Sequence, residues 1–211
     1  MNERFDALIV DYGGVLTTPM QDAMVLFAAE LGIELQDLVR AALGAYSGSD
    51  DPLVTDFEMG KLSEEEFSSA FAQRLAEISG TPVETTGLVS RMFRLDPEES
   101  MFEAIGAART SGFKTGLLSN SWGTALYPYE RLQGLFDEIV ISGEVGLRKP
   151  DPAIFRLIVE RLGVPGERCV FVDDHPGHLA AAVEQQMTPV LHTAPVATIA
   201  ALESLLEVSL S

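Results

Sequence analysis

The sequence is poor in cysteine, in basic residues and in long hydrophobic runs, and each shortage excludes a class of protein. Its single cysteine, Cys169, cannot form an internal disulfide, which argues against a disulfide-stabilised extracellular scaffold. The 14 lysines and arginines face 32 aspartates and glutamates, and this formal net charge of −18 argues against nucleic acid or an acidic membrane surface as a partner. No apolar run approaches the roughly 20 residues of a membrane span, and a single cysteine is compatible with a reducing compartment, so we expect a cytoplasmic protein.

The apolar content is high enough for a globular core, since 46% of the 211 residues are hydrophobic and 22% are charged. Length alone predicts one domain, with or without a modest insertion. Short apolar runs typical of buried parallel strands occur at residues 7–12, 114–118, 138–142, 168–173 and 188–192. Helical patterns separate the later runs, and this alternation predicts an α/β fold with a parallel sheet.

Helix-start signals divide the chain further. Asp96-Pro97, Asp151-Pro152 and His175-Pro176 each combine a capping residue with a proline suited to a first helical turn. Residues 18–95 show only helical signals, among them a capping box from Ser63 to Glu66. We therefore expect a helical subdomain inserted between the first and second strands.

Polar side chains follow the strands at the edge where ligands of open parallel sheets bind. These residues are Asp11, Ser119, Asn120, Lys149, Asp173 and Asp174. Taken singly, most have an ordinary alternative, such as a helix cap or a solvated lysine. The adjacent acids are the exception, because two carboxylates together are costly without a cation or hydrogen bonds.

In this order, four segments resemble the motifs of the haloacid dehalogenase-like hydrolase superfamily. They are residues 11–16, 118–121, 148–155 and 171–174. The resemblance covers nearly the whole chain. It implies a Rossmann-like, three-layer α/β core formed by residues 1–17 and 96–211, with a small helical cap at residues 18–95.

The resemblance also implies a phosphatase that uses Mg²⁺. Asp11 would be the nucleophile and form an aspartyl-phosphate, a covalent mechanism open to carboxylates. The expected metal ligands are Asp11, the carbonyl of Gly13 and Asp174, a ligand set that suits magnesium. The expected phosphate-binding residues are Ser119, Asn120 and Lys149. Asp173 and His178 would not contact the substrate but would position the residues that do, with Asp173 orienting Lys149 or a metal-bound water.

One position departs from the family pattern. Phosphatases of the superfamily commonly carry a second aspartate, the general acid/base, where this chain has Gly13. General acid–base catalysis contributes roughly 10²–10⁴-fold to rate. His175 and His178 are candidate replacements, with capping or surface roles as the alternative. His178 itself stands where relatives often carry Asn or Asp.

Three functions are compatible with this departure. The first is a phosphatase for substrates with good leaving groups, or one that uses another acid. The second is a metal-independent 2-haloacid dehalogenase, for which the acid pair at residues 173–174 would be a burden. The third is a non-catalytic relative that binds a phosphorylated ligand or a protein.

For the first function we expect a small phosphorylated substrate and the possibility of a homodimer. The cap would choose the substrate, with the mouth of the site formed by Met20, Tyr46, Phe57 and Met59, although each of these is equally suited to the core of the cap. Trp122 would either cover the site or pack on a neighbouring helix.

Overall fold

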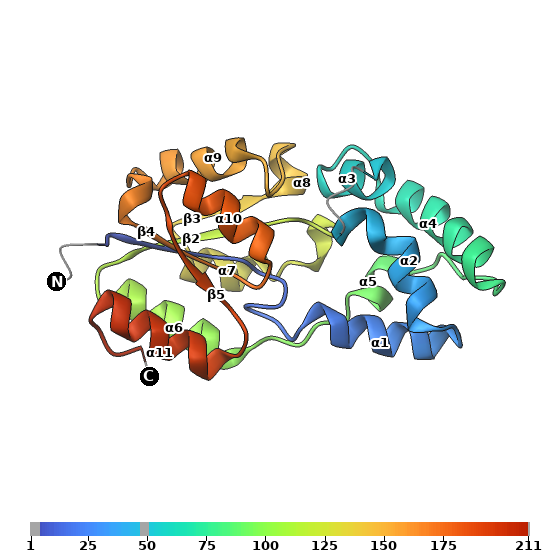
Figure 1. Ribbon diagram of the computed structural model, residues 1–211, viewed down its shortest axis with the longest axis horizontal. Helices are drawn as coiled ribbons and strands as arrows, with labels where there is room; N and C mark the ends of the chain where they lie inside the picture. Colours follow the sequence, from blue (N-terminus) through green and yellow to red (C-terminus); the bar gives the residue numbers. More distant parts are fainter. Residues whose placement is uncertain (1–4, 47–50, 211) are drawn as a thin grey trace.

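A five-stranded parallel sheet lies between two layers of helices in the computed structural model, which describes residues 5–46 and 51–210, without the side chains of residues 43–46 (Figure 1). The strands are β1 (Ala7–Val10), β2 (Lys114–Ser119), β3 (Glu138–Ile141), β4 (Cys169–Asp173) and β5 (Thr188–Leu191). Every strand pairing within this sheet is parallel. The α/β fold class is therefore confirmed, and each strand lies within a residue or two of the run that predicted it.

The order of the strands shows where a ligand site is expected. The order is β3-β2-β1-β4-β5, so the direction of winding reverses between β1 and β4. Such a switch point opens a crevice at the carboxyl ends of the two strands. Val10 pairs with Val172 there, and the amide of Asp11 donates to the carbonyl of Val172 at 2.9 Å. The residues that follow β1 and β4 are consequently neighbours.

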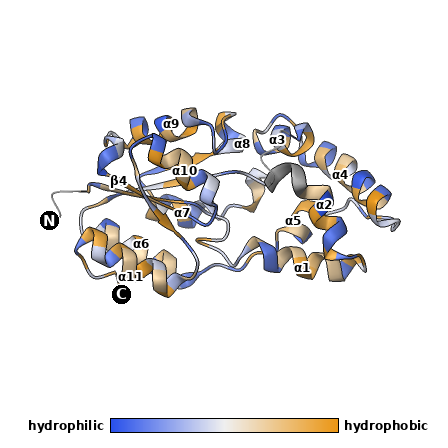
Figure 2. Ribbon diagram, viewed as in Figure 1, coloured by the Kyte–Doolittle hydropathy of each residue, from blue (hydrophilic) through white to orange (hydrophobic). Residues whose placement is uncertain are grey.

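Side chains alternate between the two faces of the sheet, as strand geometry requires. Leu8 and Val10 pack with α6 (Glu99–Thr110), α7 (Tyr129–Leu135) and α11 (Pro195–Leu206). Ala7 and Ile9 pack with α9 (Pro152–Leu162) and α10 (Pro176–Glu184), and the buried Cys169 lies in this second cluster. Figure 2 shows both hydrophobic and hydrophilic residues on these helices, as expected of helices with one buried side.

The helices of residues 18–95, called the cap from here on, form a hydrophobic cluster of their own beside the sheet (Figure 1). They are α1 (Met20–Leu31), α2 (Leu35–Tyr46), α3 (Pro52–Glu58), α4 (Glu64–Ser79) and α5 (Leu88–Met92). The capping box predicted at Ser63 and Glu66 is present. The boundaries at 17/18 and 95/96 stay a prediction. The side chain of Tyr46 lies outside the described part of the chain.

Two of the three predicted proline-linked helix starts are confirmed. Asp151 accepts a hydrogen bond from the amide of Ala153, and His175 accepts one from the amide of Gly177. The start predicted at Asp96-Pro97 is wrong. Residues 96–98 instead run antiparallel to residues 16–18, where the amide of Glu98 donates to the carbonyl of Leu16, so α6 begins only at Glu99.

The remaining elements are short: α8 (Ser142–Val145), and the 3₁₀ turns η1 (Thr124–Leu126) and η2 (Gly166–Arg168). Among the described helices, from α1 to α11, none has the length and apolarity needed to cross a bilayer.

Candidate active site

A cavity of about 130 Å³ lies at the switch point, between the sheet and the cap. The core contributes polar residues from four loops: Asp11, Gly13, Asn120, Arg148, Asp174, His175 and His178, together with Trp122. The cap contributes Met20 and Glu58. The structure thus brings most of the predicted site residues to one cavity, while Lys149 and Asp173 lie buried behind it.

Lys149 joins two carboxylates at the base of this cavity. Its ammonium Nζ lies 2.9 Å from Asp11 Oδ1 and 2.6 Å from Asp173 Oδ2, and the lysine side chain is completely buried. The amide of Tyr12 also donates to Asp11 Oδ1, at 2.7 Å. Both contacts fall on the same oxygen of Asp11, Oδ1.

The electrostatics of this triad follow from burial and from the opposite charges. Burial raises the pKa of Asp11 to about 7, against the lowering effect of Lys149. Burial also disfavours the charged forms of Lys149 and Asp173. For Lys149, the two carboxylates outweigh the effect of burial and raise its pKa. For Asp173, the effect of burial is outweighed by Lys149 and His178, which hold the pKa of this carboxyl group well below its usual range.

The two histidines have separate positions. His178 Nδ1 lies 3.1 Å from both carboxylate oxygens of Asp173, the contact expected of a residue that supports the site. Burial lowers the pKa of His178, so its imidazole is neutral at neutral pH. His175 Nδ1 caps α10, and its amide donates to Asp173 Oδ1 at 2.8 Å. Both histidines therefore have structural contacts through Nδ1.

Asp173 and Asp174 differ in what surrounds them. The oxygens of Asp173 receive Lys149, His178 and the amide of His175, whereas Asp174 lines the cavity with Asp11. Partial burial, together with the charge of Asp173, raises the pKa of Asp174 to about 6. Ligand atoms of Asp11, Asp173 and His178 lie within 4.8 Å of one another, and this group does not include Asp174.

Gly14 keeps space open for Asp174. Its φ is +73°, a region that L side chains rarely adopt, and a Cβ atom added there would overlap Asp174 Oδ2. Glycine is required at this position both by the backbone turn and by the close approach of the carboxylate.

The predicted phosphate-binding residues of the second strand have intramolecular partners. The side-chain amide of Asn120 donates to the carbonyl of Lys149 at 3.0 Å and accepts from its amide at 2.8 Å. Ser119 Oγ lies 2.9 Å from the hydroxyl of Tyr127. Asn120 therefore fixes the backbone that carries Lys149, and phosphate binding by Ser119 and Asn120 stays a prediction.

Glu58 is a candidate functional residue that the sequence reasoning missed. It is the last residue of α3, its side chain is 4% exposed, and its Oε2 lies 2.6 Å from Nε of Arg148. Burial raises the pKa of Glu58 to about 7, although Arg148 opposes the shift. One signal was available in the sequence: a single acid between Phe57 and Met59, two apolar residues, directly before a turn at Gly60.

A second cavity of about 250 Å³ adjoins the first and has aromatic walls. The two share Gly13, Asn120 and Trp122. Its other walls are the apolar or aromatic residues Tyr12, Phe93, Leu95, Leu126 and Tyr127, together with Gly123 and the polar residues Arg94 and Ser119.

The residues expected at the mouth of the site divide between these cavities and the cap core. Trp122 covers the cavities and also packs on the cap, with its ring centroid 4.5 Å from that of Phe93. Met20 lines the first cavity as expected. Phe57 stacks on Phe67 in the core of the cap, and neither Phe57 nor Met59 is among the residues that line the two cavities.

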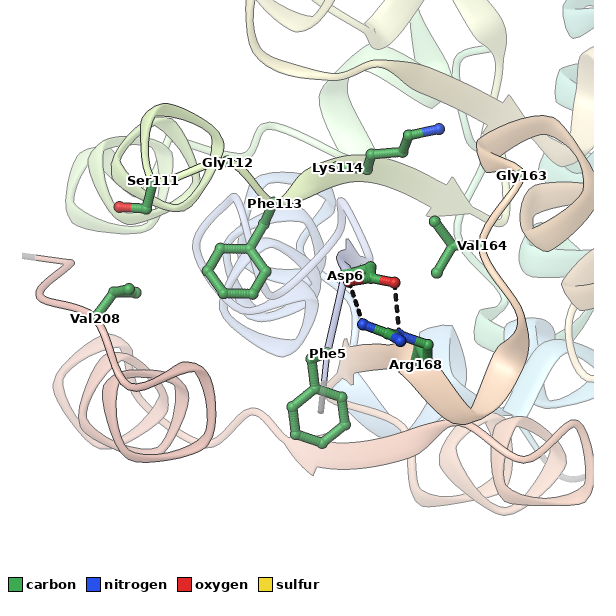
Figure 3. A pocket seen from close by; sticks show the side chains of 10 residues that line it. All are labelled: Phe5, Asp6, Ser111, Gly112, Phe113, Lys114, Gly163, Val164, Arg168 and Val208. Atoms are coloured by element: carbon green, nitrogen blue, oxygen red, sulfur yellow. Dashed lines mark hydrogen bonds and ion pairs between the residues drawn. The ribbon is translucent and has the colours of Figure 1, made fainter. Parts of the chain in front are cut away.

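The opposite edge of the sheet holds a larger cavity of about 710 Å³ (Figure 3). Figure 3 shows Asp6 and Arg168 paired on its wall, and Lys114 Nζ donates to the carbonyl of Leu162. The charged groups of these three residues are thus already engaged within the chain. None of the predicted site residues lines this cavity, which lies at the amino ends of the strands.

Comparison with known proteins identifies relatives for nearly all of the chain. A model of the haloacid dehalogenase-like hydrolase family matches residues 5–184. Mouse acyl-CoA dehydrogenase family member 10 is 29% identical over 96% of the chain, and phosphoserine phosphatase from Thermus thermophilus is 35% identical over 50% of it. The chain spans 19% and 45% of the lengths of these two relatives.

Solved structures share the fold. A predicted HAD-like family hydrolase from Porphyromonas gingivalis superposes with a TM-score of 0.72 and 21% identity, covering 98% of this chain and 100% of that one. A HAD family enzyme from Bacteroides thetaiotaomicron, in complex with magnesium and inorganic phosphate, gives a TM-score of 0.63 and 20% identity, with coverages of 90% and 95%.

Proposed function

Because the chain belongs to the haloacid dehalogenase-like hydrolases, we propose that it is a Mg²⁺-dependent phosphohydrolase that acts through an aspartyl-phosphate on Asp11. The observation that carries this proposal is the pairing of Asp11 with the buried Lys149, at the base of a cavity that Asp174 also lines. The phosphatase named among the relatives supports the same reaction class.

The donors at the site fit a magnesium ion. Asp11, the carbonyl of Gly13 and Asp174 supply the hard oxygen ligands that this ion prefers, and a small number of protein ligands leaves room for water. The space that Gly14 leaves beside Asp174 keeps that carboxylate within the cavity. We assign Asp174 rather than Asp173 as the ligand because the oxygens of Asp173 are engaged by Lys149 and His178. When bound, the ion would neutralise charge on the transferring phosphoryl group.

The residues of the chain supply the remaining chemistry. Asp11 Oδ2 attacks phosphorus and the ester P–O bond breaks, which leaves an aspartyl-phosphate. Lys149 stays within hydrogen-bonding distance of Asp11 Oδ1 and offsets the charge of nucleophile and phosphate. Asp173 holds the ammonium from the other side, and Asn120 fixes the lysine backbone. Such preorganised charge is commonly the largest contribution to catalysis.

The walls of the two cavities suggest the kind of substrate. The first cavity, about four water volumes in size at roughly 30 Å³ each, suits a phosphate group. The second has aromatic and apolar walls and suits a leaving group with a ring or a short apolar chain. We propose a small phosphate monoester of this kind as the substrate. The homodimer and the cytoplasmic location stay predictions.

A phosphate-release assay with and without Mg²⁺ tests this function, using the parent chain and Asp11→Asn on a panel that includes an aryl phosphate. We expect Mg²⁺-dependent release by the parent and its loss in the variant. Release that survives Asp11→Asn would contradict the nucleophile assignment. Halide release from 2-haloacids in EDTA would favour a dehalogenase instead. Tight binding of phosphate esters without turnover would favour a non-catalytic relative.

A further inference from the structure

The proposed phosphatase mechanism, on which this inference rests, lacks a proton donor. Gly13 stands where a second aspartate is expected, so the ester oxygen would leave without a proton. Among the described residues, three carboxyl groups line the first cavity: Asp11, Glu58 and Asp174. Asp11 is the assigned nucleophile and Asp174 the assigned metal ligand. Glu58 is the carboxyl group of these three to which no role has been assigned.

The size of the cavity brings Glu58 within reach of the substrate. A space of about 130 Å³ is largely filled by one phosphate group. An ester whose phosphorus touches Asp11 therefore places its bridging oxygen close to the cavity walls. Glu58 forms the wall on the cap side, and Asp11 and Lys149 are near enough to influence its ionisation.

The backbone of Glu58 is fixed to the core. Its carbonyl accepts a hydrogen bond of 2.5 Å from Ser142 Oγ, which in turn accepts one of 2.7 Å from the amide of Ser121. Two residues later, Gly60 (φ +70°) lies so close to Gly143 that an added Cβ atom would overlap the Gly143 carbonyl. The end of α3 is therefore held against the start of α8, which follows β3, and Ser142 links it to Ser121 in the loop that follows β2.

The side chain of Glu58 has the properties of a proton-transfer group. Burial raises its pKa to about 7, so near neutral pH both the acid and the carboxylate are populated. Arg148 Nε lies 2.6 Å from Glu58 Oε2 and forms an ion pair with the carboxylate. Each histidine keeps only Nε2 for proton transfer, because His175 Nδ1 caps a helix and His178 Nδ1 contacts Asp173.

We propose that Glu58, supplied by the cap, is the general acid/base that replaces the missing aspartate at position 13. In the first step Asp11 Oδ2 forms a bond to phosphorus while the ester P–O bond breaks, and the Glu58 proton passes to the departing oxygen. In the second step the Glu58 carboxylate takes a proton from water as the water oxygen attacks phosphorus. The Asp11–phosphorus bond then breaks, inorganic phosphate leaves, and both carboxyl groups return to their starting states.

Leaving-group dependence tests this assignment, because kcat/KM reports the step in which the ester bond breaks. The assay compares a nitrophenyl phosphate, whose leaving group departs readily as an anion, with an alkyl phosphate, whose leaving group needs a proton. We expect Glu58→Gln to lower kcat/KM for the alkyl ester by about 10²–10⁴-fold, and that for the nitrophenyl ester by much less. Glu65→Gln, at an exposed position on α4, is the matched control and should change neither value.

Rescue separates chemistry from structure. A Cβ atom at Gly13 would meet Met20 Sδ at 3.5 Å, an ordinary contact, so Gly13→Asp fits sterically. Added to Glu58→Gln, it should restore kcat/KM for the alkyl ester at least tenfold. Glu58→Asp, which keeps an acid, gives a second variant should Glu58→Gln fold poorly, and it should lose less on the alkyl ester than Glu58→Ala.

An equal loss on both esters, or a failure of Gly13→Asp to rescue, would overturn the proposal and leave Glu58 as a positioning partner of Arg148. If the parent chain releases phosphate from neither ester, the result overturns the proposed function itself and not only the role of Glu58.

Discussion

The Oε2 atom of Glu58 lies 2.6 Å from the Nε atom of Arg148, and this ion pair joins the last residue of α3 to the residue directly before Lys149. Both side chains are largely buried, at 4% and 17% exposure. A buried ion pair is weak evidence for stability, because the cost of removing both charges from water offsets their attraction. Burial of Glu58, which Arg148 offsets only in part, makes stability depend on pH.

We predict that the unfolding free energy of Glu58→Gln increases relative to that of the parent chain as pH rises. The pKa of Glu58 is about 7 in the fold against 4.5 for an unperturbed glutamate, so the folded state binds the proton more tightly. The parent therefore loses unfolding free energy between about pH 4.5 and pH 7, by up to about 3 kcal/mol from this group. Glutamine does not titrate and escapes that loss.

Urea unfolding of both proteins at pH 4.5 and at pH 8 measures the effect. Glutamic acid and glutamine are close in shape and charge at the lower pH, so the comparison there controls for lost contacts. A difference in unfolding free energy between the two proteins that stays constant with pH would contradict the raised pKa.

Lys149→Met should destabilise the fold and abolish turnover. It leaves Asp11 and Asp173 as neighbouring buried carboxylates without a cation, and breaking a buried ion pair in this way typically costs about 3–5 kcal/mol. Lys61→Met removes an exposed pair with Asp56 and should change stability by less than about 1 kcal/mol. Denaturant titration of both variants checks the contrast, and equal destabilisation would contradict the role of the triad.

Gly14→Ala should weaken magnesium binding as well as stability. Both Gly14 and Gly32 have positive φ values near +70°, but only at Gly14 would a Cβ atom meet Asp174, whereas Gly32 has open space around it. Each substitution should cost about 1–2 kcal/mol of unfolding free energy from backbone strain. Only Gly14→Ala should raise the Mg²⁺ concentration needed for half-maximal phosphate release. The same rise in Gly32→Ala would assign the effect to general destabilisation.

Trp122 provides an optical signal of substrate binding. It is the single tryptophan of the sequence, and it lines both cavities of the site. Titration with a non-hydrolysable aryl phosphonate in Mg²⁺ should change its fluorescence with saturation, because an aromatic group enters the cavity beside it. An alkyl sugar phosphonate of similar charge should bind at least tenfold more weakly. Equal affinities would contradict the assignment of the second cavity to a leaving group with a ring or a short apolar chain.

Much of the fold followed from local patterns. Each strand appeared as a short apolar run because parallel strands covered on both faces bury nearly every side chain. Asp11 and Asp173 were identifiable for the related reason that a carboxylate directly after such a run lies at the functional edge. The helix start at Asp96 was mispredicted because the competing signal, pairing with residues 16–18, comes from a segment 78 residues away.

Glu58 illustrates what a local pattern does not contain. Its neighbours in sequence belong to the cap, whereas its side-chain partner, Arg148, is 90 positions away in the core. Burial of this acid depends on how the cap packs against the core, and the helical periodicity of the cap sequence does not specify that interface. Asn120 lines the first cavity, and its hydrogen bonds to the backbone of Lys149 depend on the same kind of distant contact.

The indole of Trp122 connects the folding of the core with that of the cap. It follows β2 in the core, but it packs among Phe67 and Phe93 in the hydrophobic cluster of the cap. Unfolding of the cap would therefore expose a residue of the loop that follows β2, and disorder of that loop would remove an aromatic ring from the interior of the cap. We expect the two parts to unfold as one cooperative unit, so the chain should melt in a single calorimetric transition although the core and the cap have separate hydrophobic clusters.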